Sequence, residues 1–169
     1  MTSVLFDFVD PSGVALWHPI NDGVMGGLSS SELCPDFAGH ARFTGYVSFA
    51  NNGGFASIRC QPGDYGRMGV TAYLLQVLGD GKRYKLNLRT DSGFDGINYQ
   101  ARFEPMAGRW TTCRLACADF LPTWRGQPVP GAPPLDASMV RQMGLMIADR
   151  QAGPFELGIR SIAVELVGS

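Results

Sequence analysis

Two stretches rich in asparagine, aspartate and glycine are the strongest candidates for a functional surface in this chain. The first contains Asn21, Asp22, Gly23, Met25, Gly26, Gly27 and Ser29, and the second contains Asn51, Asn52, Gly53 and Gly54. Closely spaced glycines let the backbone take positive φ or pass close to another surface, while Asn and Asp side chains hydrogen-bond their own backbone. This chemistry shapes loops and presents amides for docking. It supplies no group that makes or breaks a bond.

Catalysis would need a nucleophile with a base, a carboxylate pair, a metal or a cofactor, and none is indicated. The sequence holds only two histidines, His18 and His40, and a structural or solvated role is expected for both. A Ser-His-Asp triad stays open by count alone, although no G-x-S-x-G elbow supports one. The glycine-rich stretch lacks the spacing of nucleotide-binding loops and is not followed by a helix pattern. No catalytic residue and no cofactor are predicted.

Metal ligation is also not indicated. Cys34, Cys60, Cys113 and Cys117 show no C-x-x-C spacing and no paired histidines, so free, mostly buried thiols are expected. Two aspartates, at positions 91 and 95, could offer oxygens to a calcium ion, but their spacing does not match an EF-hand loop. Ordinary turn aspartates are the alternative, and no metal ligand is predicted.

Binding of another molecule is the function that these residues support best. The two stretches, together with Arg59, Trp124 and Arg125, offer amides, guanidinium groups and an aromatic face. Aromatic faces stack on apolar surfaces, and amide or guanidinium groups make directed hydrogen bonds, so polypeptide or carbohydrate could bind there. The alternative is that the Asn and Gly residues only make turns and that Trp124 is a core residue.

Composition limits the class of protein. The chain has 169 residues, 45% of them hydrophobic and 17% charged, with a net charge of −1. This indicates one folded domain over residues 1–169, and the weak net charge disfavours nucleic acid as a partner. No run approaches the length of a membrane span, and the N-terminus has no leader pattern, so no integral membrane protein is expected. The expected location is the cytoplasm, peripheral to the inner membrane only through a partner.

Short alternating segments separated by turn residues run along the whole chain. They predict nine or ten strands and no helix longer than two turns, hence an all-β antiparallel sandwich of jelly-roll type. In the segment 41–49, the residues Ala41, Phe43, Gly45, Val47 and Phe49 are expected to face inward.

Four further segments carry specific expectations. Residues 70–78 are apolar on both faces and predict a central strand covered on both sides, with a helix as the alternative because Ala, Leu and Gln favour one. Residues 79–82, Gly-Asp-Gly-Lys, predict a hairpin to the strand that follows. Residues 116–134 contain four prolines in seven positions and predict a long irregular loop. Residues 155–166 form one closing strand or a pair.

Several of these motifs occur in one order along the chain and carry a family resemblance. They are Trp17, Asn21 to Ser29, Phe43 to Ser48, Asn51 to Arg59, Gly79 to Tyr84, Tyr99, Trp110, Phe120, Arg125-Gly126 and Gly153 to Leu157. This series resembles the complex I intermediate-associated protein 30 family over nearly the whole chain.

The resemblance implies a galactose-binding-domain-like β-sandwich. Mitochondrial members of the family assist assembly of respiratory complex I, the NADH:ubiquinone oxidoreductase, as chaperone-like factors without established catalytic residues. The resemblance thus implies a non-catalytic protein-binding module whose partner is an assembly intermediate of a respiratory complex. The bare domain and the missing transit peptide fit a free-standing bacterial relative. A carbohydrate-binding module is the alternative.

Overall fold

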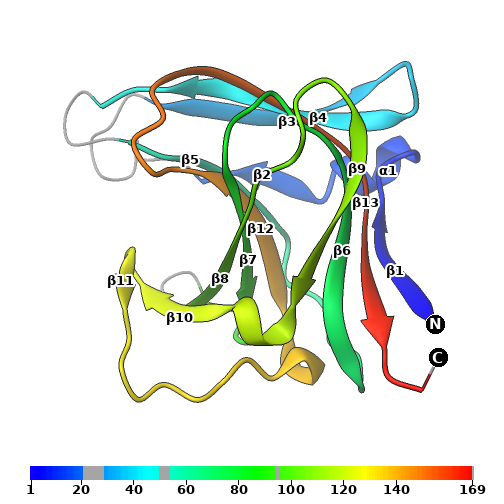
Figure 1. Ribbon diagram of the computed structural model, residues 1–169, viewed down its shortest axis with the longest axis vertical. Coiled ribbons are helices and arrows are strands. Elements are labelled where there is room, and N and C mark those ends of the chain that lie inside the picture. Colours follow the sequence, from blue (N-terminus) through cyan, green and yellow to red (C-terminus); the bar gives the residue numbers. More distant parts are fainter. Residues whose placement is uncertain (21–28, 50–53, 94–95, 169) are drawn as a thin grey trace.

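The computed structural model describes residues 1–20, 29–49, 54–93 and 96–168, which form two antiparallel β-sheets packed face to face (Figure 1). The first sheet contains, in spatial order, β3 (Ser30–Asp36), β4 (His40–Val47), β13 (Gly153–Leu166), β6 (Val70–Leu78) and β9 (Trp110–Ala116), with β1 (Thr2–Asp7) also paired to β13. The second contains β11 (Gln127–Pro128), β10 (Leu121–Trp124), β8 (Asn98–Phe103), β7 (Tyr84–Arg89), β12 (Gln142–Ile147), β5 (Ala56–Cys60) and β2 (Trp17–Pro19). The predicted all-β antiparallel sandwich is confirmed.

Helical segments are short in the described part of the chain. They are α1 (Pro11–Val14), η3 (Cys117–Asp119) and η4 (Ala137–Met139). Asp10 caps α1 by accepting a hydrogen bond from the Ser12 backbone, and Asp136 caps η4 through the Ser138 backbone. Aspartate is a preferred N-cap residue, which explains why a short helical turn begins after Asp136.

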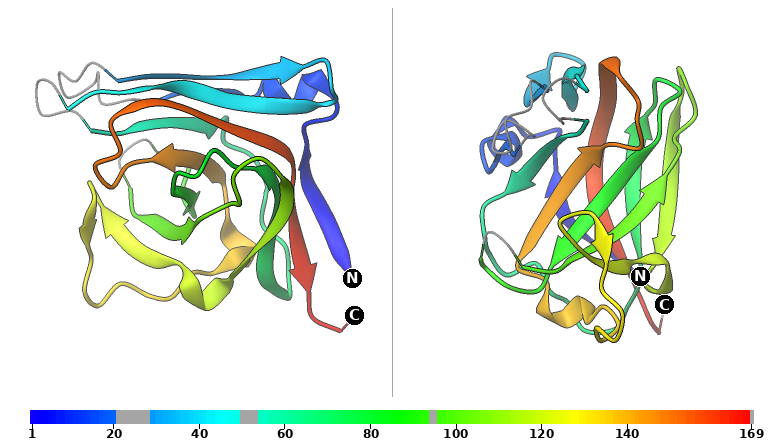
Figure 2. Two further views of the ribbon diagram at one scale, coloured as in Figure 1. Left: turned by 45° about the horizontal axis from the view of Figure 1, so that its top comes forward. Right: turned by 90° about the vertical axis from the view of Figure 1, so that its left-hand side faces the viewer.

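Strand β13 is the strand around which the first sheet is built. Its first half pairs with β4, its second half pairs with β1, and β6 runs along its other edge. The register shifts between Ile159 and Ser161, and there the Arg160 carbonyl accepts the Phe8 backbone N–H at 2.8 Å. Such a bulge bends a strand while keeping it continuous. The closing segment is therefore one long strand, and β1 beside its end brings the two termini together (Figure 2).

The core lies between the two sheets and follows the predicted alternation. Ala41, Phe43 and Val47 of β4 have no exposed surface. The prediction was wrong for Phe49, which is 44% exposed because β4 ends two residues earlier and its pleat no longer controls direction.

Strand β6 forms as predicted but is not covered on both sides. Tyr73, Leu75 and Val77 are fully buried, whereas Gln76 is exposed on the outer face of the first sheet. An antiparallel sheet with one face on the core and one toward solvent gives this pattern.

The hairpin predicted at residues 79–82 is wrong, because β6 and β7 lie in different sheets. Asp80 stabilises the connection between the two sheets. Its Oδ1 accepts a hydrogen bond from the Lys82 N–H at 3.0 Å, and its Oδ2 accepts from the Tyr84 hydroxyl at 3.0 Å and from the Glu156 N–H at 2.8 Å. A Cβ at Gly79 would lie 2.6 Å from the Pro105 carbonyl oxygen, so this glycine permits a close backbone approach. Turn residues specify a reversal and leave the pairing partner open.

Residues 116–134 are more regular than expected. They contain η3 and a small hairpin of β10 and β11 at the edge of the second sheet. The turn residues Arg125 and Gly126 have φ of 48° and 79°, as in a two-residue type I′ turn. Pro128 ends β11 at the edge of the sheet, opposite Thr123, and the other three prolines follow the hairpin, where no ladder partner is needed.

Candidate functional site

The flanks of the two Asn/Gly stretches meet at one end of the sandwich. Ile20 donates its N–H to the Ser57 carbonyl at 2.8 Å, and the Ser29 hydroxyl accepts the Ser48 N–H at 3.0 Å. Ser31 donates its hydroxyl to the Ser57 carbonyl at 3.0 Å. The end of β2, the start of β3, the end of β4 and the start of β5 are thereby tied together. Of the predicted residues, Asn21, Asp22, Gly23, Met25, Gly26, Gly27, Asn51, Asn52 and Gly53 lie outside the described residues.

Two exposed aromatic residues lie at this end of the first sheet, which we call the loop end. Tyr46 is 52% exposed and Phe49 is 44% exposed. The Arg150 guanidinium lies 5.7 Å from the centre of the Phe49 ring, within the range of a cation–π contact. Gly54 has φ of +144° and packs against Phe49, so a side chain at position 54 would strain the backbone.

Trp124 and Arg125 lie at the tip of the β10–β11 hairpin. Trp124 is 44% exposed, which overturns the alternative that it is a core residue, and the Arg125 guanidinium stacks 4.6 Å from its ring centre. Leu121, at the start of β10, is 64% exposed. In Figures 1 and 2 the hairpin projects on the same side of the molecule as the end of β4 and the start of β5.

Arg59 lies on the outer face of the second sheet, away from both aromatic groups. Its neighbours Ile58 and Cys60 point into the core, so alternation directs Arg59 outward, opposite His18 of β2. Burial, together with the nearby Arg89 charge, lowers the pKa of Arg59 to about 10. The predicted residues therefore fall into a loop end, a hairpin tip and a sheet face.

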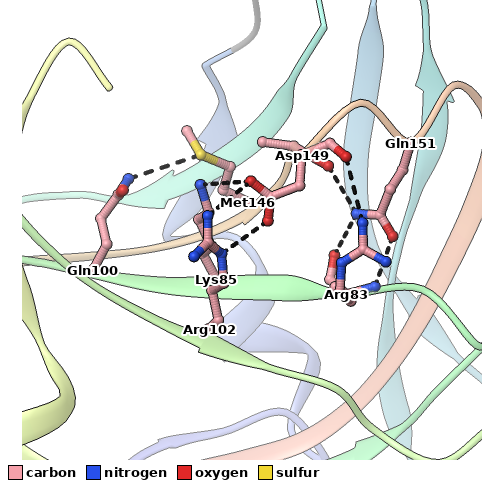
Figure 3. Close-up of polar contacts among 8 residues, drawn as sticks. Arg83, Lys85, Gln100, Arg102, Met146, Asp149 and Gln151 are labelled. Carbon is pink, nitrogen blue, oxygen red and sulfur yellow. Dashed lines mark hydrogen bonds and ion pairs between the residues drawn. The ribbon is translucent and has the colours of Figure 1, made fainter. Parts of the chain in front are cut away.

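A cluster of charged and amide side chains on the same sheet face was not predicted (Figure 3). Asp149 accepts two hydrogen bonds from Arg102 at 3.0 and 3.1 Å, and it forms an ion pair with Lys85 at 3.3 Å. These contacts, led by the Arg102 hydrogen bond, lower the pKa of Asp149. Gln151 accepts the Arg83 N–H at 2.8 Å and donates to the Arg83 carbonyl at 2.8 Å.

The backbone that presents this cluster is unusual. Asp149 and Arg150 have φ of 61° and 60°, a region that costs of order 1–3 kcal/mol for a residue other than glycine. Asp149 reaches the second sheet from this turn, while Arg150 reaches Phe49 at the loop end. The alternation of Lys85, Asn87 and Arg89 with buried leucines was the signal in the sequence that could have indicated a polar face.

In the described ranges of the chain, neither histidine forms a hydrogen bond with a serine or a cysteine. His18 is exposed, and His40 packs edge-on against Trp110 with ring centres 5.0 Å apart. Among the residues that the structure describes, no group of three or more His, Cys, Asp or Glu side chains could hold a metal. Asp91 forms an ion pair with Arg89 at 3.4 Å, while residue 95, its suggested calcium partner, lies outside the described part.

The four thiols are free, with Cys60 buried and the other three partly buried. Cys60 Sγ accepts the Met143 N–H at 3.2 Å, a contact across the β5–β12 pair. Burial raises the pKa of Cys60, Cys113 and Cys117. A thiol with a raised pKa is a weaker nucleophile at neutral pH because less thiolate is present.

Comparison with known protein families identifies the family of this chain. The family model for Complex I intermediate-associated protein 30 matches residues 6–159. The chain belongs to this family. The matched range includes every element from β2 to β12, and it therefore contains the loop end, the hairpin tip and the polar cluster.

Curated relatives of the complex I intermediate-associated protein 30 family are similar at low identity. The mitochondrial complex I intermediate-associated protein 30 of Neurospora crassa is 25% identical, covering 94% of this chain and 71% of the relative. The Drosophila melanogaster protein of the same name is 27% identical, covering 97% of this chain and 63% of the relative. An uncharacterized protein of Schizosaccharomyces pombe is 36% identical over 70 residues, 39% of this chain and 32% of that protein. This chain spans only part of each relative.

Solved structures similar to this family member include carbohydrate-binding modules. The family 11 module of a Clostridium thermocellum cellulosomal cellulase matches with a TM-score of 0.74 at 14% identity, covering 99% of this chain and 95% of the module. The same family in complex with a mixed-linked tetrasaccharide matches with a TM-score of 0.72 at 15% identity, covering 96% and 94%. At these identities the likeness is one of fold. Within the described residues, no helix is long and apolar enough to cross a membrane.

Proposed function

We propose that this chain is a non-catalytic protein-binding domain that acts as an assembly factor, or chaperone, for respiratory complex I. The observation that carries the proposal is the family match over residues 6–159. In this proposal residues 1–169 act as one binding domain, located in the cytoplasm and brought to the inner membrane by the partner.

Two exposed aromatic groups support a protein-binding surface. One is the loop end with Tyr46 and Phe49, and the other is the hairpin tip with Trp124 and Arg125. Tyr, Trp and Arg are the residue types that dominate the binding energy of protein interfaces. We assign contact roles to these groups and to the predicted residues Asn21, Asp22, Gly23, Met25, Gly26, Gly27, Ser29, Asn51, Asn52, Gly53 and Gly54.

Affinity capture from detergent-solubilised membranes with quantitative mass spectrometry tests the proposal. The wild-type chain is expected to enrich subunits or intermediates of complex I. Trp124→Ala and Phe49→Ala are expected to reduce the captured amount by about 10-fold each, as for a buried aromatic anchor. Phe37→Ala is the matched control, because Phe37 is fully exposed in the turn between β3 and β4, at the other end of β4 from Phe49.

Two outcomes of the capture experiment would contradict these assignments. Enrichment of no specific protein by a folded wild-type chain contradicts the proposal. Equal loss of capture in Phe37→Ala and the two test variants contradicts the assignment of the surface.

Carbohydrate binding is the second candidate function, supported by the half-exposed Trp124 ring beside Arg125. An exposed indole can stack on the apolar face of a sugar ring while a guanidinium binds its hydroxyl groups. A glycan array is expected to show saturable binding that is lost in Trp124→Ala. An array without signal removes this candidate.

A further inference from the structure

The outer face of the second sheet carries polar side chains across its central strands. The strand register aligns His18, Arg59, Gly144, Asn87, Gln100 and Leu121 in one row. We call the central part of this face, Arg59, Asn87, Arg89, Asn98, Gln100 and Gly144, the polar face. With strands about 4.8 Å apart, the row from Arg59 to Gln100 spans about 14 Å.

Two buried amide oxygens on the polar face have no hydrogen-bond donor in the part of the chain that the structure describes. Asn87 is 7% exposed and its Oδ1 has no partner among the described residues, and the Asn98 Oδ1 is in the same position. A buried acceptor without a donor costs about 1–3 kcal/mol. A ligand that donates a hydrogen bond to such an amide oxygen would remove this free-energy cost.

Strand β12 contributes no side chain between Arg59 and Asn87. Gly144 lies opposite both residues in the strand register. A Cβ at Gly144 would lie 2.9 Å from the Ile58 carbonyl oxygen, which keeps the position a glycine. Arg59 and Asn87 are therefore separated in the row only by a glycine.

Charge on this face and its rim is predominantly positive in the described part. The cations are Arg59, Lys85, Arg89 and Arg102, and the carboxylates are Asp91 and Asp149. Asp149 pairs with both Lys85 and Arg102, while Asp91 pairs with Arg89 and also acts electrostatically on Arg59, so two carboxylates face four cations. The field over the row therefore favours an anionic ligand.

We propose that the polar face binds an extended acidic segment of the protein partner, an inference that rests on the proposed function. The partner's backbone N–H groups donate to the amide oxygens of Asn87 and Asn98, and its carboxylates bind at Arg59. A segment of about four residues covers the row, at about 3.3 Å per residue. A peptide fits this face better than a sugar, because none of the six residues that define it is aromatic.

Binding of a synthetic peptide of alternating glutamate and glycine tests the inference. Titration followed by NMR should shift resonances in β5, β7, β8 and β12, with an affinity that falls as salt is raised. Arg59→Gln is expected to weaken binding about 10-fold. Arg109→Gln, which removes the same charge from an exposed position before β9, is the control and should change affinity less than about 2-fold.

Asn87→Ala provides a measurement that a purely structural role would not explain. It removes an acceptor that lacks a donor, so the melting temperature should stay equal or rise while peptide affinity falls. A lower melting temperature with unchanged affinity would show that Asn87 only supports the fold, and the inference would be overturned.

Three other results overturn the inference. The first is tight binding of an uncharged peptide of alternating glutamine and glycine. The second is binding of an oligogalacturonate while the glutamate peptide does not bind. The third is a set of NMR shifts confined to Trp124 or Phe49. In the capture experiment, a partner held equally by wild type, Arg59→Gln and Asn87→Ala overturns this inference alone. Capture of no partner overturns the proposed function as well.

Discussion

Arg102 of β8 and Asp149 of the β12–β13 turn form a two-point contact, with Nε to Oδ2 at 3.0 Å and Nη2 to Oδ1 at 3.1 Å. The contact fixes a turn with two consecutive residues at positive φ to the outer face of the second sheet. That turn also carries Arg150 to Phe49 at the loop end. The polar face and the loop end are thus held in one relative position by the same two residues.

Asp149→Asn should lower the free energy of unfolding by about 1–2 kcal/mol, because charge-assisted hydrogen bonds to Arg102 and the ion pair to Lys85 are weakened. The contribution is moderate since part of the carboxylate is in contact with solvent. Urea unfolding measures it. Asp64→Asn, at a 78% exposed carboxylate paired with Arg141, is the control and should change stability by less than about 0.5 kcal/mol.

The Asp149 contribution should depend on pH in a defined direction. Its pKa is lowered in the folded state, so the stabilisation is present above the unfolded pKa of about 4 and is lost as pH falls through the folded value. Unfolding curves of wild type and Asp149→Asn should differ near neutral pH and converge in acid. A difference that persists unchanged into acid would assign the effect to the turn backbone.

Gly45→Ala should destabilise the chain by about 3 kcal/mol or prevent folding, because its Cβ would lie 2.0 Å from the Ser30 carbonyl oxygen of β3. Gly93→Ala is the comparison, with ordinary φ and a nearest atom 3.9 Å away, and should change stability by less than about 0.5 kcal/mol. Thermal unfolding distinguishes them. Equal melting temperatures would mean that β3 can move away from β4 at no cost.

The β10–β11 turn allows binding and stability to be separated. Gly126→Ala should cost about 1 kcal/mol because φ is +79°, whereas Arg125→Asn should stay within about 0.5 kcal/mol because Asn tolerates positive φ. Arg125→Asn should nevertheless reduce partner capture, since the contact with Trp124 is removed. Full capture by a stable Arg125→Asn variant would exclude Arg125 from the interface.

The thiols should react slowly in the native state. Cys60 is fully buried and the pKa of Cys60, Cys113 and Cys117 is raised by burial, so little thiolate is present at neutral pH. Labelling with a thiol-specific disulfide reagent should be slow in buffer, slowest at Cys60, and complete in denaturant. Rapid native labelling of Cys60 would show that β5 and β12 separate readily.

The fold class, the family and most strands can be inferred from the amino-acid sequence alone. Alternation in segments such as 41–47 and 98–103 reports which side chains face a core, and this is a local property of the chain. The capped turn at Asp136 was predictable for the same reason. The turn at Arg125 and Gly126 was missed because arginine at positive φ is an uncommon choice that propensity does not indicate.

Strand pairing and the contacts between distant side chains depend on how the two sheets pack. The Asp80 turn could not show that β6 and β7 enter different sheets, because strand partners are chosen by packing across the core. The distribution of Arg59, Asn87 and Asn98 over one face depends on the order β5, β12, β7, β8, in which strands distant in sequence are neighbours. Contacts such as Arg102 with Asp149 arise from that order, and no local pattern encodes it.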